Sequence, residues 1–169
     1  MTKHGQQKGV ALIVGLIILA VMMLLGVSVI RNVTTEERMA GNSYSRSISF
    51  QAADAALREI ELKVEANKPT ISASCNTVST VMVCAAPAAT DTPRWLDSSF
   101  ASWANATAVT SGSISVTPQY FVEYLGNTFT CDPSDSSATN ECKRYRITTR
   151  VQSSNGQSPV MLQSLYATD

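Results

Sequence analysis

The chain has 169 residues, with 13 basic and 13 acidic side chains and a formal net charge of zero. This balance excludes the strong electrostatic attraction by which basic proteins bind nucleic acid. A basic leader and an apolar segment occupy about 30 residues, which leaves enough chain for one exported domain of common size.

The segment from Gly9 to Ile30 has 22 residues and no charged side chain. A helix of this length rises about 33 Å, enough to cross a bilayer core of roughly 30 Å. Lys3 and Lys8 precede the segment, so the positive-inside rule keeps the leader cytoplasmic and exports the rest. The apolar core of a cleaved secretory signal is shorter, about 7 to 15 residues. The sequence therefore predicts a membrane helix that is kept in the mature protein.

The helical pattern continues beyond the membrane segment, and the first proline is Pro69. We therefore expect one helix over residues 10–66, whose outer half, residues 32–66, is amphipathic. Apolar residues recur at steps of three and four in this half, at Phe50, Ala53, Leu57, Ile60 and Val64. This stripe requires a cover, whereas the charged face with Arg58, Glu61 and Glu65 suits solvent or a partner.

Residues 66–118 are rich in Ser, Thr and Ala and show little periodicity, so we expect mostly loops there. The spacing of Trp95, Phe100 and Trp103 favours a short helix over residues 93–104. Three aromatic residues in such a segment more often pack a core than bind a ligand.

After Ser113 the apolar residues alternate, which predicts strands at residues 114–116, 120–125, 144–151 and 160–166. In the third strand, Arg144, Arg146 and Arg150 alternate with residues suited to a core, a pattern typical of one wet face. Asn155-Gly156 favours a tight hairpin before the last strand. These elements predict an α+β fold, in which an antiparallel meander packs on the long helix.

Four cysteines lie in the exported part, where disulfides persist: Cys75, Cys84, Cys131 and Cys142. The sequence alone allows three pairings. We favour bridges between sequence neighbours, because each pair brackets a short loop with turn-forming residues. A zinc site needs closely spaced cysteines or histidine ligands, and the exported part has neither.

The residue inventory argues against catalysis. The only histidine, His4, lies in the leader, so the exported part has no imidazole for general-base catalysis or metal binding. It also has no Ser/His/Asp set and no Gly-rich phosphate loop. We expect no enzyme activity, no cofactor and no metal.

Arg144, Arg146 and Arg150 form the one basic stripe of the exported part. Such a row is usually a solvated face, which also discourages edge-to-edge aggregation. The sharper interpretation is a surface that contacts an acidic partner or DNA phosphate.

The leader end Lys8-Gly9, the span over residues 10–31 and the segments TEERMAGN (35–42) and FQAADAALREIE (50–61) resemble one known family. It is the PilX family of minor pilins from bacterial type IV pili. The resemblance covers about the first 61 residues. Beyond them only the architecture, a helix and then a sheet with a cysteine-bracketed loop, is pilin-like.

The resemblance implies that the membrane prepilin peptidase cuts after Gly9 and methylates the new amino terminus at Val10. Most pilins have Phe at the first mature position and Glu at the fifth, where this chain has Val10 and Val14. That glutamate is thought to neutralise a neighbour's amino terminus in the apolar filament core. The departure at Val14 is compatible with a rare subunit or with one at the pilus tip.

The expected protein thus has a leader (1–9), a membrane or filament-core half-helix (10–31), an amphipathic half-helix (32–66) and a periplasmic globular part (67–169). As a minor pilin it crosses the inner membrane once and then enters the pilus, where it initiates or caps assembly and supports adhesion or twitching motility. The partners implied are other minor pilins, the major pilin and a tip adhesin. A type II secretion minor pseudopilin and a membrane-anchored periplasmic binding or adhesion domain are the alternatives.

Overall fold

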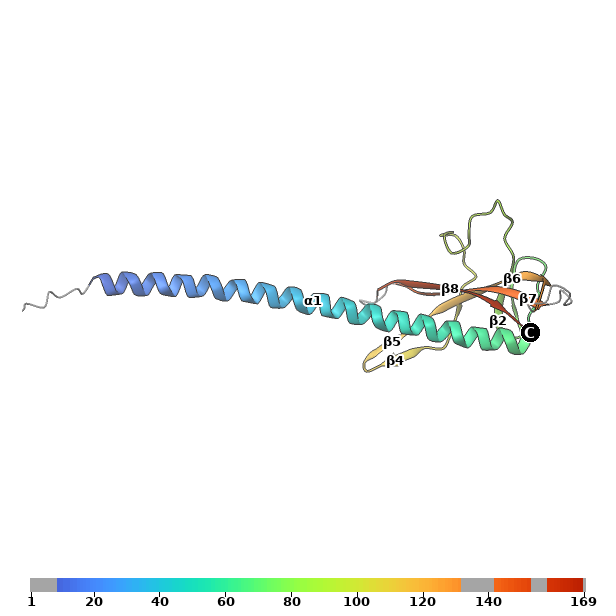
Figure 1. The fold of residues 1–169 in the computed structure, drawn as a ribbon, viewed down its shortest axis with the longest axis horizontal. Helices are drawn as coiled ribbons and strands as arrows, with labels where there is room; N and C mark the ends of the chain where they lie inside the picture. The colour runs from blue at the N-terminus through green and yellow to red at the C-terminus, as the bar shows by residue number, and fades with distance from the viewer. Residues whose placement is uncertain (1–8, 132–141, 153–157, 169) are drawn as a thin grey trace, which may run out of the picture. The chain divides into compact units, whose positions relative to one another are not determined.

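A computed structural model of the chain describes residues 9–131, 142–152 and 158–168. The chain divides into two compact units, Met1–Ser43 and Tyr44–Asp169. One helix is followed by eight strands: α1 (Val10–Asn67), β1 (Cys75–Val78), β2 (Val81–Ala85), β3 (Ala104–Asn105), β4 (Val109–Ser111), β5 (Ile114–Val116), β6 (Gln119–Phe129), β7 (Cys142–Val151) and β8 (Val160–Ala167) (Figure 1).

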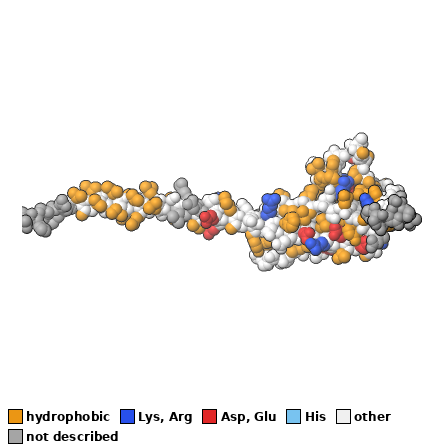
Figure 2. Space-filling model, viewed as in Figure 1, with side chains coloured by type: hydrophobic (Ala, Val, Ile, Leu, Met, Phe, Trp, Pro, Cys, Tyr) orange, Lys and Arg blue, Asp and Glu red, His pale blue; other side chains and the backbone are white. Residues whose placement is uncertain are grey.

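The first unit contains the apolar part of α1. By length and composition α1 is the one described helix that could cross a membrane, with a mean hydropathy of 3.1 over its most apolar 18 residues. None of that stretch is buried within the protein, and Figure 2 shows its side chains as an apolar band. These exposed apolar residues match the membrane helix that the sequence predicts.

The second unit begins with the amphipathic part of α1. The helix ends at Asn67, just before Lys68, whose φ of 41° is left-handed, and Pro69. Ala53, Ile60 and Val64 are fully buried as predicted, whereas Phe50 is 53% exposed. The prediction for Phe50 was wrong because the buried face is centred on Ala53 and Ile60, and Phe50 lies on its flank.

The large sheet has the strand order β1-β2-β6-β7-β8, with β3 paired to β6. The predicted antiparallel meander is present as β6, β7 and β8. One prediction was wrong: β5 does not join the meander but pairs with β4 in a separate two-stranded sheet. The large sheet also gains a strand that we did not predict, β2, which runs parallel to β6. In addition, β1 and β2 lie in a segment for which we expected loops.

The inner face of the sheet packs on α1. The larger core cluster contains buried residues from α1 and from the central strands β2, β6 and β7. They are Ala56, Ile60 and Val64 of the helix and Val81, Val83, Tyr120, Val122, Tyr145 and Ile147 of the strands. Thr149 Oγ1 donates a buried hydrogen bond of 3.1 Å to the carbonyl of Ala53. Glu61 and Glu65, which we expected to face solvent or a partner, accept hydrogen bonds from Ser164 and Tyr166 of β8. These bonds pin the edge strand to the helix.

The opposite face of the sheet is covered in part by residues 86–103, which connect β2 to β3 (Figure 1). The helix predicted over residues 93–104 is absent, and the segment is a series of turns. Phe100 and Trp103 pack edge-on against Phe121 of β6, with ring centroids 4.9 and 4.8 Å apart. The aromatic residues are therefore core residues, as expected, but of an outer core on the sheet.

Two predicted turns lie outside the described residues. They are the hairpin at Asn155-Gly156 and the turn-forming run at residues 132–137.

Candidate functional site

The predicted cleavage position coincides with the start of the helix. Gly9 is in a turn and α1 begins at Val10. No neighbouring atom lies within 4 Å of a Cβ placed on Gly9, so this glycine is not required by packing within the described chain. The boundary that a peptidase would read is thus a polar leader, an accessible glycine and then an apolar helix.

The fifth helical residue, Val14, has an exposed side chain on an uncharged helical surface. An unpaired amino terminus at Val10 would have no carboxylate within the same turns of the helix. Any neutralising group would have to come from another molecule, or the terminus would have to lie where water reaches it.

Both cystines join the sequence neighbours that we favoured. The Cys75–Cys84 bridge crosses the paired strands β1 and β2, and the Cys131–Cys142 bridge ties the end of β6 to the start of β7. Neither leaves a free thiol. Their place at strand ends indicates a structural role.

The arginine row does not form the wet face that the alternation predicted. Glu123, fully buried on β6, accepts from Arg146 Nε at 2.6 Å and also from Arg94 of the covering segment. The Arg146 guanidinium lies 4.7 Å from the ring centroid of Trp95. The covering segment is thereby held to the sheet by a charge cluster and by stacking.

The two other arginines of the row are also half-buried. Arg150 lies 3.6 Å from the ring centroid of Trp103 and donates twice to Gln119 Oε1, at 3.1 and 2.9 Å. Burial lowers the pKa of the Arg150 guanidinium. Arg144 lies over Phe129, 4.5 Å from its ring centroid. The three arginines therefore make contacts within the chain rather than forming a solvated surface.

Sequence reasoning missed Glu123, although a signal existed. It is the one charged residue in the apolar run from Tyr120 to Leu125, and the neighbouring predicted strand carries arginines at alternate positions. A carboxylate in such a run predicts a buried ion pair, because an unpaired buried charge is too costly.

The described residues contain no group of three or more His, Cys, Asp or Glu side chains that could hold a metal ion. Two buried hydroxyls, Ser49 Oγ and Tyr145 Oη, have no hydrogen-bond partner among the described protein atoms.

An apolar N-terminal helix whose outer part packs on a mostly antiparallel, disulfide-braced sheet defines a pilin-like protein. Two family models match the chain: "PilX N-terminal" over residues 8–58 and "Type IV pilus assembly protein PilX C-term" over residues 64–168. The chain belongs to the PilX family of type IV pilus assembly proteins. The second match extends the resemblance to the sheet domain. No curated protein and no solved structure matched the chain.

Proposed function

We propose that this minor pilin initiates or caps type IV pilus assembly. The observation that carries the proposal is the uncharged first part of α1, which starts directly after Gly9, extends to Ile30 and has valine at position 14. A subunit without a carboxylate there cannot neutralise the amino terminus of a neighbour in an apolar helix bundle. A subunit at the tip has no further subunit above it, so there is no amino terminus on that side for it to neutralise.

In this proposal the prepilin peptidase cuts between Gly9 and Val10 and methylates Val10. The protein waits as a single-pass inner-membrane protein and then enters the filament with other minor pilins, the major pilin and a tip adhesin. Adhesion and twitching motility depend on it through the pilus. Family membership supports a structural role without enzyme activity.

The amino terminus of the mature protein tests the proposal directly. Mass spectrometry of protein from piliated cells should find N-methyl-valine at position 10. An intact Met1 would favour the anchored periplasmic domain instead. Deleting the gene should lower the number of pili per cell, whereas loss of protein secretion with normal pili would favour a type II secretion pseudopilin.

A further inference from the structure

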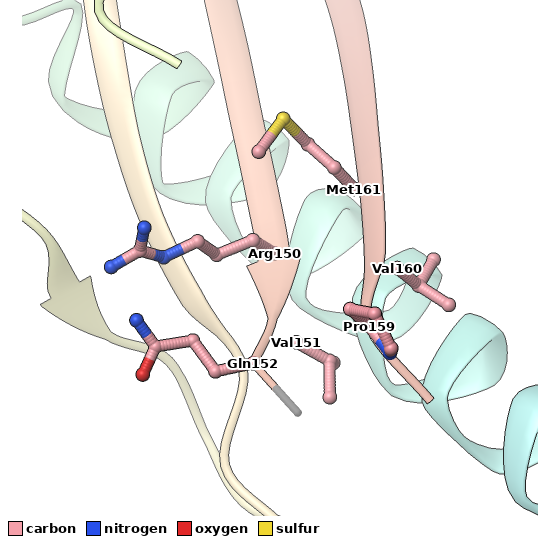
Figure 3. Close-up of a pocket in the computed structure, with 6 residues that line it drawn as sticks. All are labelled: Arg150, Val151, Gln152, Pro159, Val160 and Met161. Atoms are coloured by element: carbon pink, nitrogen blue, oxygen red, sulfur yellow. The ribbon is translucent and has the colours of Figure 1, made fainter. Parts of the chain in front are cut away.

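Hollows lie at both ends of the β7–β8 pair. The first, of about 350 Å³, lies beside Arg150, whose side chain runs from β7 away from β8 (Figure 3) and interacts with Gln119 and Trp103. The second hollow, of about 240 Å³, is lined by Leu125, Phe129, Arg144, Leu165, Tyr166 and Ala167. The arginine of the second hollow is less engaged within the chain than that of the first.

Arg144 is the one arginine of the row that has no hydrogen-bond acceptor among the described residues. Arg146 and Arg150 each donate to a side-chain oxygen of β6. Arg144 instead stacks on Phe129, with 4.5 Å between the guanidinium carbon and the ring centroid. Stacking engages a flat face of the guanidinium and leaves the N–H donors at its edge unused. Because Arg144 is half-buried, a carboxylate on that edge would replace water that reaches it only in part.

The other side chains on the exposed side of this hollow are apolar. Leu165 and Ala167 lie on the exposed side of β8, and the Leu165 side chain is 73% exposed. A ligand that fits these walls carries an apolar group beside its negative charge. An Asp or Glu next to an apolar side chain on a protein surface meets both requirements, whereas inorganic phosphate meets only the first.

A second copy of this chain is poorly suited to supply the carboxylate. Every carboxylate described in the second unit already accepts a hydrogen bond within its own chain. Asp97 follows Leu96, which is 70% exposed, so these two residues form an apolar and acidic pair on the surface. Asp97 is, however, bonded to both the amide and the hydroxyl of Ser99, and docking on Arg144 would compete with these bonds. A different protein is therefore the better source.

We propose that a different pilus subunit docks on this hollow, with an Asp or Glu side chain on the Arg144 guanidinium and a neighbouring apolar side chain against Leu165. The ion pair supplies specificity, and burial of the apolar walls supplies affinity. The inference rests on the proposed function only in that the partner is a pilus subunit.

Site-specific photocrosslinking of the full-length chain in piliated cells tests this proposal. Benzoylphenylalanine replaces Gln163, which lies on the same exposed side of β8 as Leu165 but does not line the hollow. The control position is Thr110, which is exposed on the separate two-stranded sheet. Irradiation should join position 163 to a different pilus subunit, and position 110 should not give this adduct. Peptide mapping should find an Asp or Glu beside an apolar residue in the cross-linked segment.

Charge variants then test the Arg144 contact. Arg144→Gln should lower the adduct yield several-fold, whereas Arg58→Gln, at an exposed arginine of α1, should not. Arg144→Glu should abolish the adduct, and replacing the mapped carboxylate of the partner by Arg should restore it. A change in another protein cannot repair a misfolded domain, so this restoration separates docking from folding.

The absence of an adduct at position 163, an adduct with a second copy, a yield unchanged by Arg144→Gln, or a charge exchange that restores nothing would each overturn the proposal. Asp132, Asp135 and Glu141 lie outside the described residues, and exchanging them for their amides should leave the yield unchanged. A several-fold rise would show that a carboxylate of this chain occupies Arg144, and would also overturn the proposal. Normal piliation after gene deletion would instead refute the initiation role, and the cross-linking result would still decide the Arg144 contact.

Discussion

Glu123 is a fully buried carboxylate whose charge is balanced by two arginines from different parts of the chain. Arg146 comes from the adjacent strand, whereas Arg94 comes from the segment that covers the sheet. The pairing offsets a desolvation cost of several kcal/mol per ion. The ion pairs also hold the covering segment at one position on the sheet, because they are directional. An apolar contact alone would fix that position less strictly.

Glu123→Gln should destabilise the protein by about 3 kcal/mol or more, because it leaves two half-buried guanidinium groups without an anion. Urea unfolding of the full-length protein in detergent, followed by the fluorescence of Trp95 and Trp103, measures the loss. The matched control is Asp54→Asn, which breaks the exposed pair with Arg58 and should cost less than about 1 kcal/mol. Equal midpoints for the two variants would contradict a structural role for the cluster.

Gly9→Val should block removal of the leader, since the peptidase must accommodate the backbone at the junction of a polar leader and an apolar helix. No described residue lies within 4 Å of a Cβ placed on Gly9, so folding should be unaffected. The measurement is the mass of the protein when it is co-expressed with an active prepilin peptidase. Gly5→Val, within the leader, is the control and should be processed normally. A mature mass identical to wild type for Gly9→Val would refute the prepilin interpretation.

At the scale of elements, the β1–β2 hairpin is the least expected part of the fold. Its two-residue loop, Ser79-Thr80, has φ values of 46° and 71°, the left-handed region that favours Asn and Gly. The Cys75–Cys84 bridge and the Thr80 carbonyl, which accepts from Tyr120 Oη at 3.4 Å, hold the loop in place. Tertiary contacts thus stabilise a turn that its own residues disfavour.

The double variant Ser79→Asn/Thr80→Gly should raise the free energy of unfolding by about 1 kcal/mol or more, because it relieves two left-handed residues. Chemical denaturation under non-reducing conditions measures the gain. The control, Thr90→Gly, lies in a turn without a left-handed φ and should give no gain, since added chain freedom favours the unfolded state. A loss of stability in the double variant would contradict the turn geometry.

Sequence periodicity was sufficient to locate α1, β6, β7 and β8. β8 alternates between exposed and buried residues as expected, whereas β6 and β7 are buried on both faces over part of their length. It failed for β1 and β2, whose short strands follow a left-handed Ser74 and are completed by a disulfide and by long-range pairing. The parallel contact of β2 with β6 depends on residues about 40 positions apart, which no local pattern encodes. The arginine row was misread for the same reason, since its cover comes from residues 86–103.

At the scale of the whole molecule, the two units have opposite solvent requirements. Large apolar side chains of the first unit are exposed along its helix, each worth about 1.5 to 3 kcal/mol when removed from water. Lipid can meet this requirement before assembly, and packing among neighbouring helices can meet it in a filament. The second unit has its own buried core and requires neither. In the proposed function, transfer from membrane to pilus would therefore change only the surroundings of the helix.

The charge at position 14 should decide where the subunit is found in that filament. Val14→Glu supplies a carboxylate at the fifth position after the predicted cleavage site. If the native chain is placed at the tip as proposed, this variant should also occur along pilus shafts. Fluorescently labelled copies counted along sheared pili measure the distribution. Val21→Glu is the control: Val21 is as exposed as Val14 but lies elsewhere in the span, and its carboxylate should hinder insertion without redistributing the subunit. Native copies spread evenly along shafts, unchanged by Val14→Glu, would show that valine is merely tolerated there and would remove the basis for a tip or initiation role.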